Sequence, residues 1–594
     1  MLHALNSGAP KFAVSNMSFI QRTFPITQWL PGYKKSQLSG DLFAGLTVGI
    51  MLIPQGMAYA LIAGLPPVYG LYASIVPQLM YAIFGTSRQL SVAPVAMDSL
   101  LVAAGVSVLA TEGTDAYIGF AILLAFFMGL FQLLLGVMRM GFITNLLSKP
   151  VISGFTSAAA LIIGLNQLKY LLGTDIEKSN KVYEVLWNVI QKLDETHLIT
   201  LMIGVAGIVI IKLAKRIHKA MPGALIAVVV GTLLVYLLNL HEVGVQIVKT
   251  IPDGLPSFRL PDFSLGQFAE LIPLAMTISV VAFMEAYSVA KAIESKRKDY
   301  KVVANQELIG LGAANLVGSL FQSFPVTGGF SRSAVNEQSG AHTPLSSIVS
   351  AVLIGFTLLF FTPLFYYLPS AILASVIMVA VSSLIDLKYI RKLWRENKVE
   401  FGLLLATFLV TLNFSMVPGI VTGVVLSILI LLYKSAYPHI AVLGRLKDQM
   451  EFRNIKRFKD LEVWEDKLIL RIDAPLSFIN IQYLKDYLEE VLEAKSQIQM
   501  VILDASAISY LDATAVQGLS DIIEKLEEKN IQLILTEVIG PVRDVLHKTG
   551  LLKRIGINNI YLTLNDALDG NSVASYDNRE KAIQHGLIAE ESNE

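Results

Sequence analysis

The chain has 594 residues, of which 54% are hydrophobic and 16% charged, and its mean hydropathy of +0.58 excludes an ordinary soluble globular protein for the chain as a whole. Its 47 Lys and Arg residues are balanced by 47 Asp and Glu residues, so the net charge gives no indication of nucleic acid as a partner. The absence of cysteine excludes disulfides, iron–sulfur clusters, haem-thiolate centres and cysteine-ligated zinc.

Residues 1–40 form a mixed, polar N-terminal segment that lacks the apolar core of a cleavable signal peptide. After this segment, three long stretches contain no Asp, Glu, Lys or Arg: residues 42–87, 338–385 and 401–433. Because ~20 apolar residues are enough to cross a bilayer, each stretch is long enough for more than one span or for one span and part of another. The sequence therefore predicts a polytopic α-helical membrane domain over residues 41–436.

The apolar runs and their Gly, Pro and charge boundaries predict fourteen spans, centred near Val48, Ser74, Leu101, Phe127, Ala160, Val205, Val230, Val280, Ala313, Ala334, Gly355, Val376, Phe408 and Leu426. Basic clusters fall in alternate loops, and the loops between them are acidic or neutral. Lys and Arg are enriched in the cytoplasmic loops of membrane proteins. With an even number of spans, this pattern predicts that the N-terminus and the region after the last span both lie in the cytoplasm.

The third and tenth predicted spans are interrupted by matching breaks rich in Pro, Gly and Ser, at residues 91–99 and 324–333. Each break falls in the third span of a set of seven, and such paired breaks indicate the binding site of a transporter built from inverted repeats. A half-helix that begins at a break presents free N–H groups and the positive end of its dipole, which suits an anion. The alternative is that both breaks are kinks that serve helix packing.

At these residues the sequence resembles the SulP family of anion transporters. The resemblance rests on Pro-Gln-Gly-Met-Ala-Tyr-Ala at 54–60, Gly-Leu-Pro-Pro-Val-Tyr-Gly-Leu-Tyr at 64–72, Gly-Thr-Ser-Arg at 85–88 and Phe-Ser-Arg-Ser-Ala-Val-Asn at 330–336. It implies a seven-plus-seven inverted repeat in which spans 1–4 and 8–11 form a core domain and spans 5–7 and 12–14 form a gate domain. It also implies elevator-like movement of the core, a homodimer and a C-terminal STAS domain.

The resemblance also places the anion site between the two half-helices, at Gln55, Tyr59, Val95, Ala96, Gly329, Phe330, Ser331 and Arg332. The residue types suit an anion, because Gln55 can donate an amide N–H and Ser331 a hydroxyl. Arg332 would add a positive field or pair with a carboxylate. Alternative interpretations remain for two of these residues, namely an interhelical hydrogen bond for Gln55 and core packing for Tyr59.

Glu285 interrupts an apolar run at residues 271–291, and the resemblance to sulfate carriers links a Glu at this place to proton coupling. A carboxyl group in a low-dielectric medium takes up a proton more readily, which would offset the charge of the anion. The alternative is a fixed ion pair with Arg332. Sodium-coupled bicarbonate members usually carry an Asp and a nearby Thr here, and residues 283–288 depart from that pattern. We therefore expect H⁺ as the coupling ion, with no other cofactor and no metal.

Two further isolated carboxyl groups, Asp98 and Glu337, are open to two interpretations, a place in the proton path or a role in helix packing.

The region after the last span alternates between strand-like and helix-like segments, which is typical of a small α/β sheet. Strands are expected at 468–473, 500–504 and 531–536, and helices at 481–494, 513–529 and 541–549. The segment resembles a STAS domain over residues 450–570, with Ala513 in place of the Ser that related anti-sigma antagonists phosphorylate. We expect interaction and regulation from it rather than catalysis. Residues 571–594 are polar and are expected to be disordered.

Together these features predict a transporter and not an enzyme, most simply a secondary active, proton-coupled sulfate symporter that works by an elevator mechanism. The alternatives are a sodium- or proton-coupled bicarbonate or dicarboxylate symporter, and an uncoupled anion exchanger or channel. The expected partners are a small inorganic anion, membrane lipid, a second copy of the chain and a cytoplasmic regulator of the STAS domain. The expected location is the inner or plasma membrane.

Overall fold

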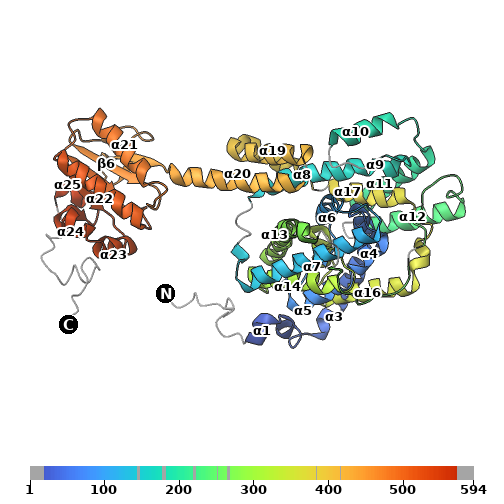
Figure 1. Ribbon diagram of the computed structural model, residues 1–594. Helices are drawn as coiled ribbons and strands as arrows, with labels where there is room; N and C mark the ends of the chain where they lie inside the picture. The colour runs from blue at the N-terminus through green and yellow to red at the C-terminus, as the bar shows by residue number, and fades with distance from the viewer. Residues whose placement is uncertain are drawn as a thin grey trace. The chain divides into compact units, whose positions relative to one another are not determined.

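The computed structural model describes residues 19–142, 148–176, 182–217, 222–250, 252–263, 268–382, 384–414, 416–447 and 449–570. The chain divides into two compact units, Met1–Ser427 and Ile428–Glu594 (Figure 1). Residues 1–18 of the expected N-terminal segment and the whole of the expected disordered tail, 571–594, lie outside the described residues.

Helices account for nearly all of the first unit. They are α1 (Phe19–Thr23), α2 (Ile26–Trp29), α3 (Lys35–Ile62), α4 (Pro67–Tyr72), α5 (Val76–Phe84), α6 (Ala96–Val106), α7 (Asp115–Val137), α8 (Lys149–Asn166), α9 (Leu168–Leu172), α10 (Val182–Gln191), α11 (Leu198–Ile217), α12 (Gly223–Leu237), α13 (Leu271–Arg297), α14 (Ala304–Ser319), α15 (Phe330–Gln338), α16 (Leu345–Phe360), α17 (Ser370–Ser382), α18 (Leu387–Glu396), α19 (Lys398–Asn413) and α20 (Met416–Ala436), the last of which continues into the second unit.

All but one of the predicted span centres fall inside a helix, and the exception, Ser74, lies in a turn between α4 and α5. Among the described residues, six helices are long and apolar enough to cross a membrane by themselves, and others, such as α6, are shorter. The second predicted span is interrupted, because its backbone turns at residues 73–75. Pro66 and Pro67 begin α4 and Pro77 lies in the first turn of α5, where a missing N–H costs no hydrogen bond.

The helices of the first unit form two groups. In one, α3 packs against α15 and α16, and α14 packs against α5 and α7. In the other, α8 packs against α19, and α17 packs against α8 and α11. We call the first group the core and the second the gate, after the two domains that the resemblance predicts.

Close helix contacts in the core depend on residues without a side chain. A Cβ added to Gly70 of α4 would lie within van der Waals overlap of the Gly56 carbonyl of α3, and one added to Gly45 of α3 would lie 2.5 Å from the Ser346 carbonyl of α16. Small residues allow such close approach of backbones within membranes, where packing rather than hydrophobic burial drives helix association. The two glycines therefore fix how α3 sits between its neighbours.

Two fully buried carboxylates also hold the core together. Asp41 of α3 accepts hydrogen bonds from the backbone N–H groups of His342 and Thr343, at 2.6 and 2.9 Å, and from the Thr343 hydroxyl at 2.7 Å. Glu307 of α14 accepts from the Tyr81 hydroxyl at 2.6 Å and from the Thr86 N–H at 2.7 Å. Each carboxylate satisfies donors at a chain turn that neighbouring helices leave open, so each ties two distant segments together.

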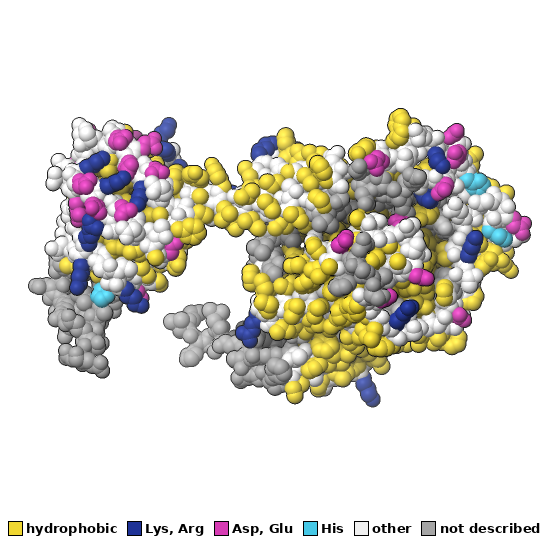
Figure 2. Space-filling view, in the orientation of Figure 1, with side chains coloured by type: hydrophobic (Ala, Val, Ile, Leu, Met, Phe, Trp, Pro, Cys, Tyr) yellow, Lys and Arg dark blue, Asp and Glu magenta, His cyan; other side chains and the backbone are white. Residues whose placement is uncertain are grey.

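Charge is distributed differently on the two units. Hydrophobic side chains cover most of the visible face of the first unit, whereas Lys, Arg, Asp and Glu are interspersed over the second (Figure 2). The exposed side chains of the first unit include large apolar ones such as Val209 of α11, Leu233 of α12 and Val352 of α16. Apolar side chains on the outside are expected where lipid rather than water is the surrounding medium.

The second unit is a sheet covered by helices. Its strands are β3 (Ile440–Leu446), β4 (Phe452–Asn454), β5 (Leu461–Glu462), β6 (Lys467–Ile472), β7 (Met500–Asp504), β8 (Gln532–Thr536) and β9 (Ile560–Tyr561). Their order is β4-β3-β6-β7-β8-β9, with β5 beside β3, and β6 to β9 run parallel. The helices are α21 (Ile481–Ala494), α22 (Ala513–Glu528), α23 (Gly540–Lys548), α24 (Leu551–Ile555) and α25 (Leu564–Asp569).

Each strand and helix that was expected in the second unit is present within one residue at either end, as with β7 at Met500–Asp504 and α21 at Ile481–Ala494. The sheet begins earlier than the expected start at residue 450, because β3 follows directly after α20. Its strand was missed because Gly444 and Arg445 interrupt a short apolar run, a composition that is typical of a loop. Asp512 caps α22 by accepting from the Ala515 N–H at 2.8 Å, and Ala513 is the first residue of that helix.

Candidate functional site

The two breaks predicted from the sequence meet as a small antiparallel sheet. Strand β1 (Val92–Ala93) pairs with β2 (Thr327–Gly328), with Val92 opposite Gly328 and Ala93 opposite Thr327. Beyond the strands, the Gly329 N–H donates to the Ser91 carbonyl at 3.0 Å. The backbone groups that the breaks remove from helical hydrogen bonding thus satisfy one another, as they must at membrane depth.

Side chains from the neighbouring core helices hold β2 in place. Asn315 of α14 accepts from the Val326 N–H at 2.9 Å and donates to the Val326 carbonyl at 3.0 Å. The Thr327 hydroxyl donates to the Ala282 carbonyl of α13 at 2.7 Å. These bonds attach the second break to two different helices, so the break is a fixed part of the core.

Each break opens directly into a half-helix. Val95 is the N-cap of α6, and Gly329 is the N-cap of α15. The first helical hydrogen bonds run from the Ser99 N–H to Val95 and from the Ser333 N–H to Gly329. The N–H groups of residues 96–98 and 330–332 therefore have no acceptor within their own helices, and they carry the positive ends of two helix dipoles.

Arg332 joins the second half-helix to the first break. Its side chain is 2% exposed, and its guanidinium donates to the carbonyls of Pro94 at 2.9 Å and Ala93 at 3.2 Å. A Cβ on Gly329 would lie 2.7 Å from Nη2 of Arg332, so glycine is required for the guanidinium to lie against the backbone there. The alternative of a fixed ion pair between Arg332 and Glu285 is not seen among the described residues, since no contact within 4.0 Å joins the two side chains.

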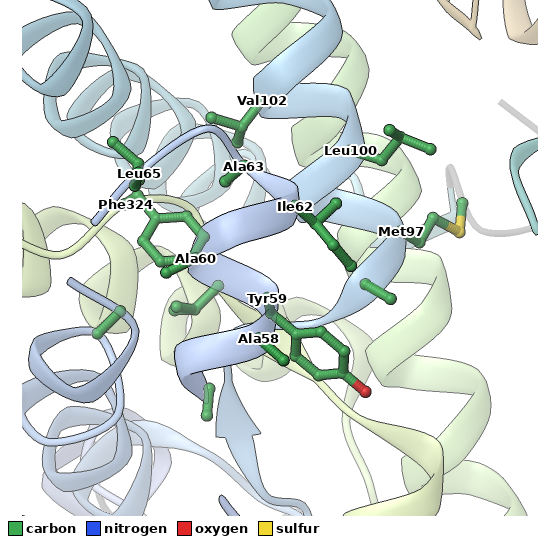
Figure 3. Close-up of a cluster of buried hydrophobic side chains, with 14 of the residues drawn as sticks. Ala58, Tyr59, Ala60, Ile62, Ala63, Leu65, Met97, Leu100, Val102 and Phe324 are labelled. Atoms are coloured by element: carbon green, nitrogen blue, oxygen red, sulfur yellow. The ribbon is translucent and has the colours of Figure 1, made fainter. Parts of the chain in front are cut away.

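The predicted residues of the first span lie on α3, close to this arrangement. Tyr59 is buried beside the cluster that α3 and α6 form, and its hydroxyl points away from the labelled apolar side chains (Figure 3). It lies within electrostatic range of Arg332 and Glu285. Gln55, one helical turn earlier, has a buried Oε1 with no hydrogen-bond partner among the described residues.

A cavity of about 220 Å³ lies at the boundary between core and gate. Of the predicted residues, Glu285 and Phe330 line it, and Oε2 of Glu285 has no hydrogen-bond partner among the described residues. Gln55, Tyr59 and the other predicted binding residues are not among its lining residues. The cavity thus joins the predicted coupling residue to the entrance of the second half-helix.

Two protein family models match this chain. A model described as the sulfate permease family matches residues 38–407, and a STAS domain model matches residues 458–567. Sulfate transporter 4.1, chloroplastic, of Arabidopsis thaliana is 38% identical over 571 residues, which cover 93% of this chain and 83% of that protein. The chain belongs to the sulfate permease family. High affinity sulfate transporter 2 of Stylosanthes hamata is 34% identical, with 95% of this chain and 88% of that protein covered.

Solved structures confirm the predicted fold of this sulfate permease family member. The structure of the murine Solute Carrier 26 family member A9 anion transporter in the inward-facing state superposes with a TM-score of 0.86 at 25% identity, covering 95% of this chain and 96% of that one. The transmembrane domain of a cyanobacterium bicarbonate transporter, BicA, superposes with a TM-score of 0.59 at 23% identity, over 67% of this chain and 98% of that one, and shows likeness of fold alone. The chain is a multi-pass membrane protein with fourteen spans in a seven-plus-seven repeat and a STAS domain.

The gate side of the cavity was not predicted from the sequence. It is formed by side chains from α8 and α20 and by a residue in the turn between α17 and α18. These residues are Val151, Ile152, Phe155, Thr156, Leu384 and Ile420. All but one of these are apolar, and they lie in spans that contain many similar residues. No local signal distinguishes them, so only the packing of the gate against the core could identify them.

The remaining isolated carboxyl groups differ in their surroundings. Glu337 of α15 lies 3.4 Å from Arg297 at the end of α13, which indicates helix packing. Asp98 of α6 has no such partner among the described residues.

Proposed function

We propose that the protein is a proton-coupled sulfate symporter in which the core carries the anion past the gate. The single observation that supports this most strongly is the convergence of three features at one place: two half-helix N-termini, the buried Arg332 and the cavity lined by Glu285. The two relatives described above are named as sulfate transporters, which favours sulfate as the anion.

In this proposal the anion binds at the ends of α6 and α15. The free N–H groups of both first turns, the Gln55 amide and the Ser331 hydroxyl donate to its oxygens. Arg332 contributes positive charge while its hydrogen bonds keep the two breaks together. Val95, Ala96, Gly329 and Phe330 supply backbone at the two helix starts, and Tyr59 closes the α3 side.

Glu285 is proposed as the proton carrier because it lines the cavity and one of its carboxylate oxygens has no donor in the part of the chain that the structure describes. When Glu285 takes up a proton, the negative charge of the loaded site decreases by one. Moving the site through a low-dielectric boundary then costs less free energy. The elevator movement is supported by the division into two helix groups and by the bonds that fix both breaks to the core. We further propose, from the loop charges, that the STAS domain lies in the cytoplasm.

The test is uptake of labelled sulfate, bicarbonate, chloride and a dicarboxylate into proteoliposomes, with and without a pH or sodium gradient. Sulfate accumulation that requires an inward proton gradient is the expected result. Glu285→Gln should abolish that accumulation while anion exchange persists, and Glu337→Gln on the neighbouring helix is the matched control. Accumulation driven by sodium, or a Glu285→Gln protein that still accumulates sulfate on a proton gradient, would contradict the proposal.

A further inference from the structure

Asp98 is a deeply buried carboxyl group that the proposed site does not use. It lies in the first turn of α6 and is 0% exposed, and neither of its oxygens has a hydrogen-bond partner among the described residues. The other fully buried carboxylates, Asp41 and Glu307, each accept at least three hydrogen bonds. The fold therefore provides donors to those two carboxyl groups, and among the described residues it provides none to Asp98.

Such a group is stable only when a proton neutralises it. An isolated ionised carboxylate in a low-dielectric interior costs far more free energy than a neutral acid does. The fold retains Asp98 at a position where any apolar residue of similar size would avoid this cost. A carboxyl that must hold a proton in one state, beside a site that changes its charge in each transport cycle, can take part in that cycle.

The surroundings of Asp98 identify Glu285 as the group that acts on it. The helices packed against α6 are α3, α7, α8, α13 and α17. Their ionisable residues are Lys35, Asp41 and Tyr59 on α3, Asp115 and Tyr117 on α7, Lys149 on α8, and Glu285, Tyr287, Lys291, Glu294, Lys296 and Arg297 on α13, with none on α17. Of these, Glu285 interacts electrostatically with Asp98. The cation at the same break, Arg332, donates instead to the carbonyls of Ala93 and Pro94.

We propose that Asp98 and Glu285 act as a pair of proton-binding carboxyl groups, so that two protons accompany each divalent anion. The inference rests on the proposed function. Met97 and Glu285 line the cavity whereas Asp98 does not, so protons reach Asp98 through Glu285. Because two protons balance the two negative charges of one sulfate, a complete cycle moves no net charge across the membrane. With Glu285 alone, one negative charge would move in each cycle.

The test compares wild type, Asp98→Asn and Glu337→Gln in proteoliposomes whose membrane potential is set with potassium and valinomycin. The wild type and Glu337→Gln should take up sulfate at a rate that increases with the pH gradient and is independent of the membrane potential. Asp98→Asn should carry about half as many protons per sulfate, and an inside-negative potential should slow it. If Asp98→Asn carries as many protons per sulfate as the wild type and is independent of the membrane potential, this inference alone is overturned. If no pH gradient drives sulfate uptake by the wild type, the proposed function is overturned as well.

A second measurement does not depend on the folding of Asp98→Asn. Infrared difference spectra taken across a pH step report the C=O stretch of protonated carboxyl groups in the intact wild-type and Glu285→Gln proteins. The wild type should show two buried-acid bands that change on the pH step, and Glu285→Gln should show neither, because protons reach Asp98 through Glu285. A single changing buried-acid band in the wild type would mean that only one carboxyl titrates and would overturn the pair.

Discussion

Arg332 and Pro94 lie 238 residues apart in the sequence, yet the Arg332 guanidinium donates to the Pro94 carbonyl at 2.9 Å. The bond connects the first turn of α15 to the residue just before the N-cap of α6. A single cation therefore serves two purposes, since it fixes the spacing of the half-helices and provides charge for the proposed anion site.

Replacing Arg332 with Ala should reduce sulfate uptake at least tenfold. Hydrogen bonds from a charged donor contribute ~1.5–3 kcal/mol each, so losing two of them loosens the breaks as well as removing the charge. Arg332→Lys should be intermediate, because an ammonium keeps the charge but cannot reach both carbonyls with a planar fork. The measurement is initial uptake against sulfate concentration, together with the melting temperature of each variant.

Gly329→Ala provides an independent control for this interpretation. It leaves the charge in place, but the added Cβ would lie 2.7 Å from Nη2 of Arg332 and displace the guanidinium. We expect weaker sulfate binding and a lower melting temperature, because the displaced guanidinium loses its hydrogen bonds to the first break. Normal kinetics in both Arg332→Ala and Gly329→Ala would contradict a role for this arrangement in the site.

Cross-linking the core to the gate should stop transport reversibly. The chain contains no cysteine, so Ile152→Cys with Phe330→Cys gives a protein whose only thiols face one cavity from opposite helix groups. A short bifunctional thiol reagent with a reducible linker should abolish uptake by more than tenfold, and reduction should restore it.

The matched control joins two core residues, Met97→Cys and Phe330→Cys, which line the same cavity. Because both belong to the core, linking them does not oppose movement against the gate, and uptake should persist. Equal inhibition of the two pairs would indicate blockage of the cavity rather than arrest of an elevator.

The site of truncation should decide whether the membrane part remains soluble in detergent. Deletion from Met450 leaves β3 without β6, its antiparallel partner, and an unpaired apolar strand promotes aggregation. Deletion from Tyr437 removes β3 as well and should give a monodisperse protein that still binds sulfate. Gel filtration and a binding isotherm for both proteins provide the comparison, and complete loss of binding by the folded shorter protein would contradict a site confined to the first unit.

Acid should weaken the second unit through Asp473. Partial burial alone would raise the pKa of this carboxyl, but hydrogen bonds from Arg471 at 2.7 Å and His439 at 2.9 Å outweigh burial and hold the pKa below its ordinary value of 3.8. Because the folded pKa is lowered, the stabilisation is present above pH ~4 and is lost as the pH falls through the folded value.

The hydrogen bond between His439 and Asp473 joins the start of β3 to the end of β6. Amide exchange in Ile440–Leu446 therefore reports the loss of this bond. On acidification, the wild-type protein should lose protection in β3 more steeply than Asp473→Asn, which lacks the ionisable group. Parallel curves for the two proteins would show that this carboxyl makes no contribution.

Much of the fold could be predicted from the sequence because apolar length and charge placement are local signals. The centres at Val48 and Val280 fall within long helices, and α21 and β7 were predicted to the residue. The short helices α10 and α18 were missed because ten-residue amphipathic segments lack the length of a span.

The site was predictable in part for the same reason. The breaks at residues 91–99 and 324–333 are visible as Pro, Gly and Ser within apolar runs, but their pairing as β1 and β2 is not. The direction of the Arg332 side chain is also not visible in the sequence, because its acceptors are main-chain carbonyls that any residue could provide. The lack of a hydrogen-bond donor to Asp98 among the described residues is likewise not visible in the sequence, because it depends on the side chains of the five helices packed against α6.

The pairing of β1 with β2 has a consequence for how the protein is made. Val92 emerges from the ribosome long before its partner Gly328, and at ~5–20 residues per second the interval is on the order of ten seconds or more. Throughout that time the unpaired backbone of the first break cannot rest in lipid without unmet hydrogen bonds. The N-terminal repeat must therefore remain beside the insertion machinery or at the aqueous interface of the bilayer. The transport site forms only when the second repeat has been inserted.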